Sequence, residues 1–446
     1  MLKRLILNRP IGNQLRRSSS ARPKLILGIE TSCDDTCAAV LDSNRNVLSN
    51  ERRSQIGSVV EVGGVMTVMS IRLHSLAIHD VVLSALRKAN VKSFAELSAI
   101  AVTVKPGQIT SLEIGIRYAQ QLALTYGLPF IPIDHMEAHG LTAMNCFEEI
   151  KFPFLALLVS GGHSQIALFK SLDLIFLIGD SYDCGPGEVI DKVARLLKLK
   201  NLGAPFDRQS GGQSIEQLAK LVDRRDAKKR FRFVELDRKK LNNCEFNYCG
   251  ARSYYKHLID GLRCENKRYP VNSVKPSGFR SVDVDTPLDE SCFISADLQA
   301  NLVSMFARRL EKAFRFIELT NILNAEVDRA EAIKLQEIDF VNERPITLPL
   351  VVSGGVACND TMMSQLEQRL KSIGCLYAQS ALKFYLPRPF YLCTDNATMI
   401  AWNGLLKYLS DPKYLLREAN EIKSVRSEYD AKLGINITSL VKKTLI

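Results

Sequence analysis

No run of apolar residues in this sequence is long enough to form a membrane-spanning helix, and no two cysteines have the Cys-x-x-Cys spacing. A helix that crosses a bilayer needs about 20 consecutive apolar residues. The eleven cysteines are scattered and odd in number, which argues against a disulfide framework and against a zinc ribbon. The sequence therefore predicts an intracellular protein with reduced thiols and no transmembrane segment.

Acidic residues are absent before Glu30, whereas the first 23 residues hold six lysines and arginines together with the run Ser18–Ser20. Leucines and an isoleucine among these residues add an apolar face. An Arg- and Ser-rich start without acids is typical of a mitochondrial transit peptide. We therefore expect residues 1–23 to be a transit peptide and the mature chain, from Lys24, to act in the mitochondrial matrix. The alternative is a basic tail that binds a partner.

Length and charge leave room for two domains and for an acidic partner. The chain has 446 residues, of which 46% are hydrophobic and 24% charged, an ordinary balance for a globular protein. The formal net charge is +11, and removal of the basic start would leave a smaller positive excess. Such an excess is compatible with nucleic-acid binding without requiring it.

Histidine is rare, yet two of the six histidines lie close together. His135 and His139 are four residues apart, a spacing that places both side chains on one face of a helix and can supply two metal ligands. Glu137 points away from that face, and it does not follow the first histidine as in the His-Glu-x-x-His proteases. The pair needs a third ligand, for which Asp395 is the best candidate. The alternative is a pair of partly exposed histidines at a helix start.

Turns of small residues recur at the ends of apolar, strand-like runs. The first turn is Glu30–Thr36 and the second is Ser160–Ser164, each between two such runs. A third, Ser353–Asn359, lies between a strand-like run and a helical pattern. Backbone N–H groups of such turns can bind phosphate. The repetition predicts an α/β fold with a duplicated nucleotide-binding architecture.

Helical periodicity and charge divide the remainder of the chain. We expect lobe I to comprise residues 24–150 and a return with a C-terminal tail at 380–446, and lobe II to comprise residues 151–379. Residues 321–343 indicate a charged connector. Residues 223–240, with nine lysines and arginines against four acids, fit a solvated loop slightly better than an RNA-contact patch. Helices are predicted at Ser75–Asn90, Ile114–Tyr126, Glu188–Leu199, Met362–Leu370 and Leu298–Leu319.

An ordered series of motifs from about Leu25 to Asn403 resembles the universal tRNA threonylcarbamoyladenosine synthases, formerly described as O-sialoglycoprotein endopeptidases. Together with the basic start, it is similar to the mitochondrial branch of that family. The motifs are Leu27–Thr36, Gly63-Gly64 with Arg72 and His74, Pro106-Gly107, His135–His139, Leu158–Ser164, Gly187–Lys192, Ser210–Gly212, Ser353–Asn359 and Cys393–Ala397.

The resemblance implies the actin/hexokinase/Hsp70-like fold, with a nucleotide and metal cleft between two lobes. It implies transfer of a threonylcarbamoyl group from threonylcarbamoyl-AMP to N6 of the adenosine 3′ to the anticodon, in tRNAs that read codons beginning with A. The implied partners are tRNA, an upstream synthase that makes threonylcarbamoyl-AMP, and a second copy of the chain in a homodimer.

The resemblance also implies roles for particular residues. The metal ligands would be His135, His139 and Asp395, a set that suits one iron or zinc ion better than magnesium. The substrate-binding residues would be Ser160, Gly161, Gly162, Asp191, Gly212, Gly355 and Asn359. Among these, Ser160–Gly162 would contact the phosphate or carbamoyl group, Asp191 the ribose and Asn359 the adenine.

The reaction needs a base that accepts the proton of the attacking amine. Three carboxylates of the first turn are candidates, namely Glu30, Asp34 and Asp35, and the sequence does not choose among them. All three can instead stabilise the turn by hydrogen bonds.

The chain departs from the family pattern near several motifs. Thr67-Val68 replace a Pro-Glu pair, Lys105 replaces a glycine, Gly185-Pro186 replace two alanines, and Gln213 replaces a proline. The loss of the Pro-Glu acid puts the catalytic rate, partner contacts or tRNA positioning in doubt. The competing functions are a small-molecule kinase of the same fold, which would not need the histidine pair, and a non-catalytic tRNA-binding or assembly protein.

Overall fold

The structure is a computed structural model that describes residues 22–55, 67–222, 243–268, 286–320, 322–323, 348–374, 382–428 and 433–445. The predicted transit peptide, apart from its last two residues, lies outside this part of the chain. So do the basic stretch 223–240 and most of the connector 321–343.

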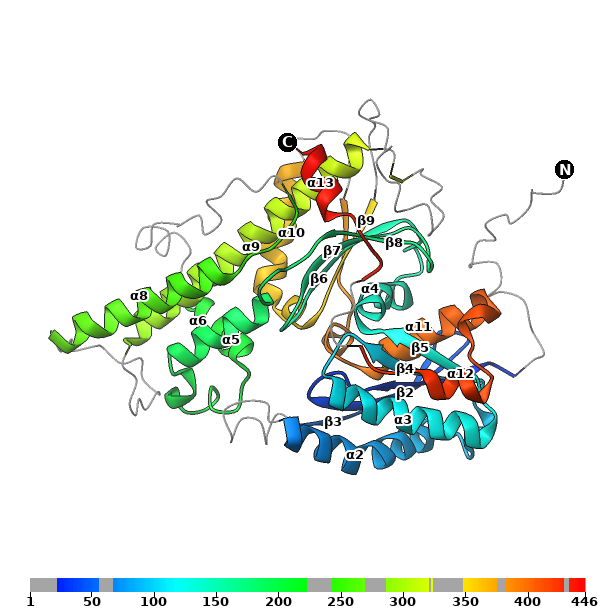
Figure 1. Ribbon diagram of the computed structural model, residues 1–446. Coiled ribbons are helices and arrows are strands. Elements are labelled where there is room, and N and C mark those ends of the chain that lie inside the picture. The colour runs from blue at the N-terminus through cyan, green and yellow to red at the C-terminus, as the bar shows by residue number, and fades with distance from the viewer. Residues whose placement is uncertain are drawn as a thin grey trace. The chain divides into compact units, whose positions relative to one another are not determined.

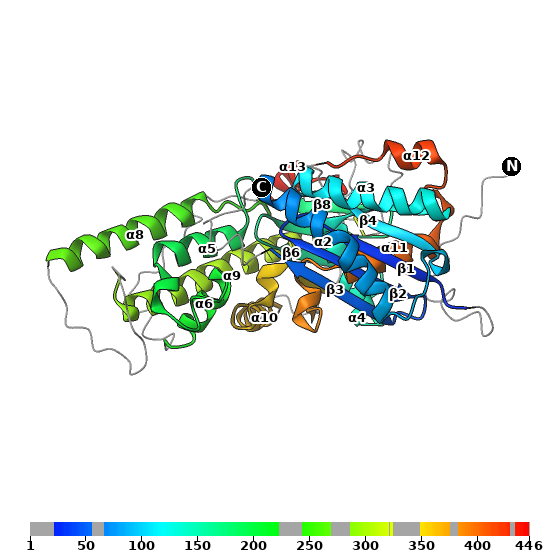
Figure 2. The same cartoon turned by 90° about the horizontal axis from the view of Figure 1, so that it is seen from below.

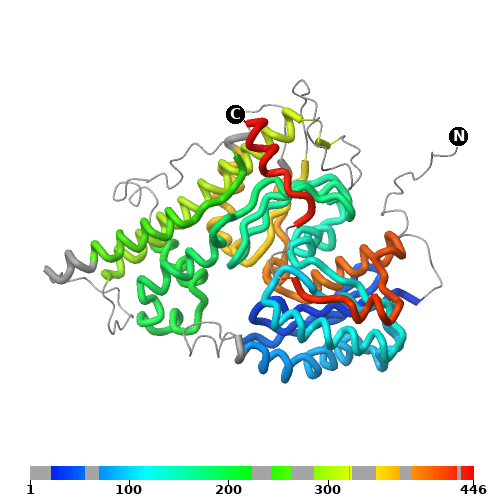
Figure 3. The backbone as a smooth tube through the Cα atoms, viewed as in Figure 1, coloured from blue at the N-terminus to red at the C-terminus, as the bar shows by residue number. Residues whose placement is uncertain are grey.

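The chain divides into two compact units, of which unit 1 comprises Met1–Glu149 and Asp395–Lys432 and unit 2 comprises Ile150–Thr394 and Leu433–Ile446. The colours of Figure 3 show unit 1 built from the blue-to-cyan and the orange-to-red parts of the chain. The chain returns to unit 1 at Asp395 rather than at 380, because strand β10 (Leu382–Tyr385) pairs with β9 in the sheet of unit 2. Residues from Leu433 onward rejoin unit 2, since β11 (Ile435–Asn436) pairs with β8.

Unit 1 is built on a mixed sheet of strand order β3-β2-β1-β4-β5, in which β1 is antiparallel to β2 and parallel to β4. The strands are β1 (Leu25–Glu30), β2 (Asp35–Asp42), β3 (Val47–Ser54), β4 (Ala99–Lys105) and β5 (Phe130–Asp134). The helices are α2 (Thr67–Lys88), α3 (Ile109–Tyr126), α4 (His135–Cys146), α11 (Ala397–Ser410) and α12 (Ala419–Ser424).

Strand β1 shows how the two faces of this sheet are covered. Leu27 and Ile29 point to one face and join the core that α2 and α3 complete. The alternate residue Gly28 points to the other face, where a Cβ would lie 2.5 Å from the backbone nitrogen of Ala401. Helix α11 therefore lies directly on the strand. Figures 1 and 2 show α2 and α3 on one side of the sheet and α11 on the other.

Unit 2 contains a second mixed sheet, of order β10-β9-β6-β7-β8-β11. Its other strands are β6 (Phe154–Val159), β7 (Ser164–Phe169), β8 (Ile175–Gly179) and β9 (Leu348–Ser353). Its helices are α5 (Pro186–Leu196), α6 (Gly211–Ala219), α8 (Cys249–Arg268), α9 (Leu288–Leu319), α10 (Asp360–Gly374) and α13 (Thr438–Thr444).

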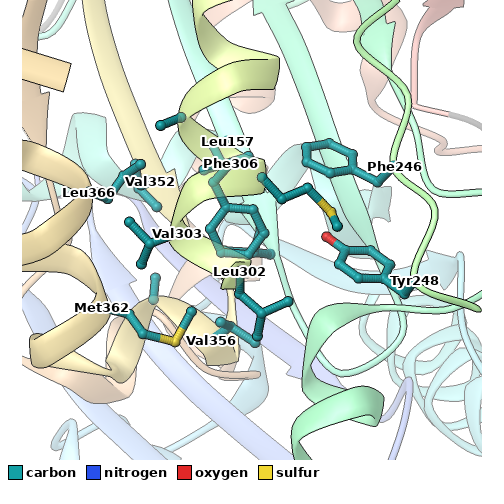
Figure 4. Close-up of a cluster of buried hydrophobic side chains, with 14 of the residues drawn as sticks. Leu157, Phe246, Tyr248, Leu302, Val303, Phe306, Val352, Val356, Met362 and Leu366 are labelled. Atoms are coloured by element: carbon teal, nitrogen blue, oxygen red, sulfur yellow. The ribbon is translucent and has the colours of Figure 1, made fainter. Parts of the chain in front are cut away.

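Helix α9 is the centre of the unit 2 core. Its buried side chains Leu302, Val303 and Phe306 face Leu157 of β6 and Val352 of β9 (Figure 4). Alternate residues of the strands reach this core, because successive side chains of a strand point to opposite faces. The core thereby holds β6 and β9, the two strands whose ends carry the turns Ser160–Ser164 and Ser353–Asn359.

The two sheets share one topology. In each, a strand is flanked by an antiparallel hairpin on one side and by two parallel strands on the other. This duplicated order confirms the predicted α/β fold of the actin/hexokinase/Hsp70-like class. The predicted helices are also confirmed, although α9 begins ten residues before the predicted start, at Leu288. Within the described ranges, no helix combines the length and the hydropathy that a bilayer span requires.

Helix α11 and strand β1 should not tolerate a methyl group between them. We expect Gly28→Ala to lower the free energy of unfolding by roughly 1–3 kcal/mol, because the new Cβ meets backbone atoms of α11. The matched control is Gly261→Ala on α8, where no heavy atom lies within 4 Å of an added Cβ and helix propensity should raise stability by up to about 1 kcal/mol. Thermal unfolding of both variants tests this, and equal effects would contradict it.

Candidate metal centre

The histidine pair lies at the start of α4, immediately after strand β5. Asp134, the last residue of β5, caps the helix by accepting hydrogen bonds from the amides of Met136 at 2.9 Å and Glu137 at 3.0 Å. The cap makes His135 the first helical residue and places His139 one turn later. Their rings meet edge to face with centroids 4.6 Å apart, and their Nε2 atoms are 3.1 Å apart. Both side chains are buried.

Asp395, the first residue of the second chain segment of unit 1, completes the group. Its Oδ1 lies 3.4 Å from Nε2 of His135 and 3.3 Å from Nε2 of His139. The next residue, Asn396, caps α11 by accepting the amide of Met399 at 2.9 Å. The carboxylate therefore stands directly before the start of α11. The potential ligand atoms of His135, His139 and Asp395 all lie within 4.8 Å of one another. Among the histidine, cysteine, aspartate and glutamate side chains of the described residues, these three form the group that could hold a metal ion.

Glu30 holds the histidine pair from the opposite side. Its carboxylate is buried and lies 3.1 Å from Nδ1 of His135. It also accepts hydrogen bonds from the amide of Ser32 and the hydroxyl of Thr103. A carboxylate on the far nitrogen of an imidazole fixes the ring and directs the lone pair of Nε2 towards the ligand position. Sequence reasoning placed Glu30 among the candidate bases and missed this arrangement.

The group forms a strongly coupled set of charges. Burial opposes ionisation of Asp395, yet the neighbouring His135 imidazole holds the pKa of this carboxyl well below its usual range. Burial likewise opposes protonation of His135, yet Glu30 and Asp395 raise its pKa well above the ordinary value. Burial lowers the pKa of His139. The neutral imidazole of His139 therefore offers a lone pair to a cation.

These residues fit a divalent metal ion. Two imidazole nitrogens and a carboxylate oxygen converge, and the carboxylate of Glu30 lies behind His135, so the three converging atoms can bind a cation. Two histidines and one carboxylate are a known ligand set for transition metals, softer than the all-oxygen set that magnesium prefers. In the described structure, Nδ1 of His139 has no hydrogen-bond partner.

The other two candidate bases differ in their surroundings. Asp35 forms an ion pair with Arg52 across the β2–β3 hairpin, with Oδ2 2.7 Å from Nη2. Asp34 is half-buried, and burial together with the nearby Asp395 raises its pKa. Burial also raises the pKa of Asp35, and Arg52 opposes that effect. A carboxylate held by an arginine accepts a proton less readily than one without such a partner. The structure thus separates residues that were equivalent in the sequence.

His74 supports the same turn from α2. Its Nδ1 lies 2.8 Å from Oγ1 of Thr36, and its Nε2 lies 2.9 Å from the carbonyl of Cys33. The imidazole is buried and bridges both ends of the segment that carries Asp34 and Asp35. The only sequence signal for this role was the place of His74 in a family motif.

In unit 2, the predicted Ser160–Gly162 turn connects β6 to β7 and lies against the start of α5. The amide of Ser160 donates to His163 within the turn, at 2.9 Å. The carbonyls of Ser160 and Gly161 accept the amides of Gly187 at 3.2 Å and Glu188 at 3.0 Å. The Ser160 N–H is therefore used by the turn itself, and the contact of Ser160–Gly162 with a phosphate or carbamoyl group stays a prediction.

Asp191 and Gly212, both predicted to bind the nucleotide, lie together. Asp191 is on α5, and its carboxylate accepts the amide of Gly212 at the start of α6. Burial raises the pKa of Asp191, while Arg195 and Lys200 oppose that effect. The N-terminus of α6 favours the ionised form of this carboxylate, which can accept hydrogen bonds from hydroxyl groups such as those of a ribose.

The third turn follows β9 and begins with a close backbone contact. Gly354 has φ +100° and leaves no space for a Cβ against the backbone of Val159, so glycine is required there. Gly355 is exposed and has nothing within 4 Å of an added Cβ. Asn359 is buried, and its Oδ1 caps α10 by accepting the amide of Met362 at 2.9 Å. Asn359 therefore has a structural role, and its contact with the adenine stays a prediction.

The departures from the family pattern are accommodated locally. Lys105 pairs with Glu428 at 3.4 Å. Gln213 exchanges hydrogen bonds with Ser210 in a capping box at the start of α6. Gly185 packs against the second turn, where a Cβ would lie 2.6 Å from the amide nitrogen of His163. Thr67 is the first residue of α2.

The fold and the His–His–Asp group define a two-unit α/β protein with a candidate metal centre in unit 1. The chain belongs to the tRNA N6-adenosine threonylcarbamoyltransferase (TsaD) family, whose model matches residues 46–402. This membership favours acyl transfer over the alternative of a small-molecule kinase.

Proteins named as mitochondrial members of this family are similar along nearly their whole length. The tRNA N6-adenosine threonylcarbamoyltransferase, mitochondrial, of Danio rerio is 37% identical over 96% of this chain and 93% of the relative. The Homo sapiens protein of the same name is 34% identical over 95% and 89%. Among solved structures, the ROK hexokinase from Thermus thermophilus has a TM-score of 0.38 at 14% identity and covers 87% of this chain and 100% of its own.

Metal content should depend on the converging side chains. We expect the full chain to bind about one divalent ion, and His139→Ala and Asp395→Ala to lose most of it, because each removes a ligand atom. The matched control is His79→Ala, since His79 is exposed and bonds to Tyr118 at 3.0 Å. Elemental analysis for iron, zinc and magnesium measures this. Full metal content in the His139→Ala variant would refute the assignment.

Glu30→Gln should weaken metal binding without removing a ligand. Loss of the charge on the far side of His135 is expected to lower metal affinity about 10- to 100-fold. Asp35→Asn is the control, because it removes a carboxylate of the same turn that pairs with Arg52. Competition with a chelator gives both dissociation constants, and an unchanged value for Glu30→Gln would contradict the orienting role.

Proposed function

We propose that this protein transfers the threonylcarbamoyl group of threonylcarbamoyl-AMP to N6 of the adenosine 3′ to the anticodon in mitochondrial tRNAs that read codons beginning with A. The observation that carries the proposal is the convergence of His135, His139 and Asp395 in a chain that matches the family model over residues 46–402.

In this reaction, the amine nitrogen forms a bond to the carbamoyl carbon, and the bond from that carbon to the phosphate oxygen breaks to release AMP. The amine is a poor nucleophile because its lone pair is delocalised into the adenine ring. The protein must hold the two reactants in line and stabilise the charge that develops on the oxygens. A metal bound by the three ligands would supply positive charge to those oxygens as a Lewis acid.

Asp34 is the proposed base. It lies in the turn next to the ligand group, and its pKa is raised by burial and by Asp395. It would accept the proton that the amine loses on attack. Glu30 is committed to His135, and Asp35 is paired with Arg52, so both support the turn instead.

Unit 2 would bind the nucleotide portion of threonylcarbamoyl-AMP. Ser160–Gly162 and Gly355 would contact its phosphate or carbamoyl group, and the adjacent Asp191 and Gly212 would contact the ribose. Asn359 retains its amide nitrogen for the adenine, because its oxygen caps α10.

The names of the relatives and the chemistry of the substrate support a setting for the reaction. The mitochondrial names of the relatives and the basic, acid-poor start support action in the mitochondrial matrix. Threonylcarbamoyl-AMP is a reactive mixed anhydride, so an upstream synthase must supply it. We also propose a homodimer, and an iron or zinc ion in preference to magnesium.

In vitro modification tests the proposal. The full chain, threonylcarbamoyl-AMP and an unmodified tRNA with adenosine 3′ to the anticodon should yield threonylcarbamoyladenosine, detected by nucleoside mass spectrometry. Asp34→Asn should lower kcat by about 100-fold or more, whereas Asp35→Asn should chiefly lower the melting temperature. Binding of tRNA without product would support the non-catalytic alternative.

A further inference from the structure

Two loops of unit 2 that are far apart in sequence lie side by side. The Sγ atom of Cys358, in the third turn, donates to the carbonyl of Phe390 at 3.5 Å. The same carbonyl accepts the amide of Cys393 at 2.9 Å. Asp360 and Arg388 form a second link, with Oδ1 3.0 Å from Nη2.

This arrangement brings two thiols together. The Cys358 and Cys393 side chains interact with each other. Each thiol donates its hydrogen to a backbone carbonyl, Cys358 to that of Phe390 and Cys393 to that of Pro387 at 3.2 Å. Cys393 is buried, and Cys358 is partly exposed. An oxidant can therefore reach the first sulfur, and the second is adjacent to it.

We propose that Cys358 and Cys393 form an oxidisable dithiol, and that the disulfide weakens nucleotide binding by the third turn. The second half of this inference rests on the proposed function, in which Gly355 and Asn359 contact the nucleotide. With a peroxide as oxidant, the Cys358 sulfur attacks one peroxide oxygen and becomes a sulfenic acid, with release of one water. The Cys393 sulfur then displaces the second water, and the two thiols have lost two electrons and two protons.

The bond has a mechanical consequence for the turn. A disulfide requires a sulfur–sulfur distance of about 2.05 Å, shorter than any hydrogen-bonded contact between thiols. Cys358 must move towards the Pro387–Cys393 segment when the bond forms. The next residue, Asn359, caps α10 through Met362, so the movement disturbs the residue proposed to contact the adenine.

Another pair of neighbouring cysteines has a different arrangement. Cys184 and Cys249 also lie near each other, but the Cys249 thiol donates to the carboxylate of Asp183 rather than to the other sulfur. Cys358 and Cys393 differ from that pair because the thiol of one and the backbone amide of the other both donate to the carbonyl of Phe390.

The first measurement is chemical. The full chain is treated with hydrogen peroxide, and its peptides are mapped by mass spectrometry without reduction. We expect a cross-linked peptide pair with Cys358 and Cys393 that has lost two hydrogen atoms and separates on addition of dithiothreitol. Cys358→Ser should abolish it, whereas Cys146→Ser, at a similarly half-buried cysteine of unit 1, should not. Absence of the cross-linked pair from the oxidised wild type overturns the dithiol.

The second measurement is the affinity for AMP, by calorimetry, before and after oxidation. We expect oxidation to weaken binding at least about fivefold, dithiothreitol to restore it, and Cys358→Ser to be insensitive to peroxide. If the oxidised wild-type protein binds AMP with unchanged affinity, the proposed effect of the disulfide on nucleotide binding is wrong. The modification assay is done on reduced protein, in which the disulfide is absent. Its result therefore tests the proposed function independently of the dithiol.

Discussion

The depth at which helix α11 packs on the sheet of unit 1 decides where the candidate metal centre lies. Gly28 on β1 and Gly404 on α11 allow the contact, since a Cβ at Gly404 would lie 2.5 Å from the Cβ of Ala101. Asp395 stands immediately before this helix. The indole of Trp402 fixes the same helix to α4 by donating to the carbonyl of Leu141 at 2.9 Å. A displacement of α11 would therefore move one ligand away from the other two.

Buried charged side chains of helix α4 are paired with opposite charges on two of its faces. On one face of α4, the imidazoles meet the carboxylates of Glu30 and Asp395. On the other face, Glu137 forms an ion pair with Lys407 of α11, with Oε2 3.1 Å from Nζ. Leaving one partner of a buried ion pair uncompensated is strongly destabilising. The pairing of α4 with α11 is thus specified by charges as well as by packing.

Elements with strong local signals could be predicted from the sequence. The hairpin turns, the strands beside them and the main helices follow from periodicity and from small residues at strand ends. The choice among the acids of the first turn could not be predicted. Asp35 meets Arg52 only because β2 and β3 pair with Asp35 opposite Ser54 and Cys37 opposite Arg52, a register that no local pattern states. The capping role of Asn359 depends in the same way on where α10 begins.

The sequence by itself determined the spacing of His135 and His139, because four residues on a helix place two side chains on one face whatever the surroundings. It also determined the repeated strand–turn–strand plan. Only the tertiary structure decided that Asp395 meets these rings and that Glu30 orients one of them. Strand order and helix packing bring together groups that lie hundreds of residues apart, and contacts of that range depend on the folded core rather than on neighbouring residues.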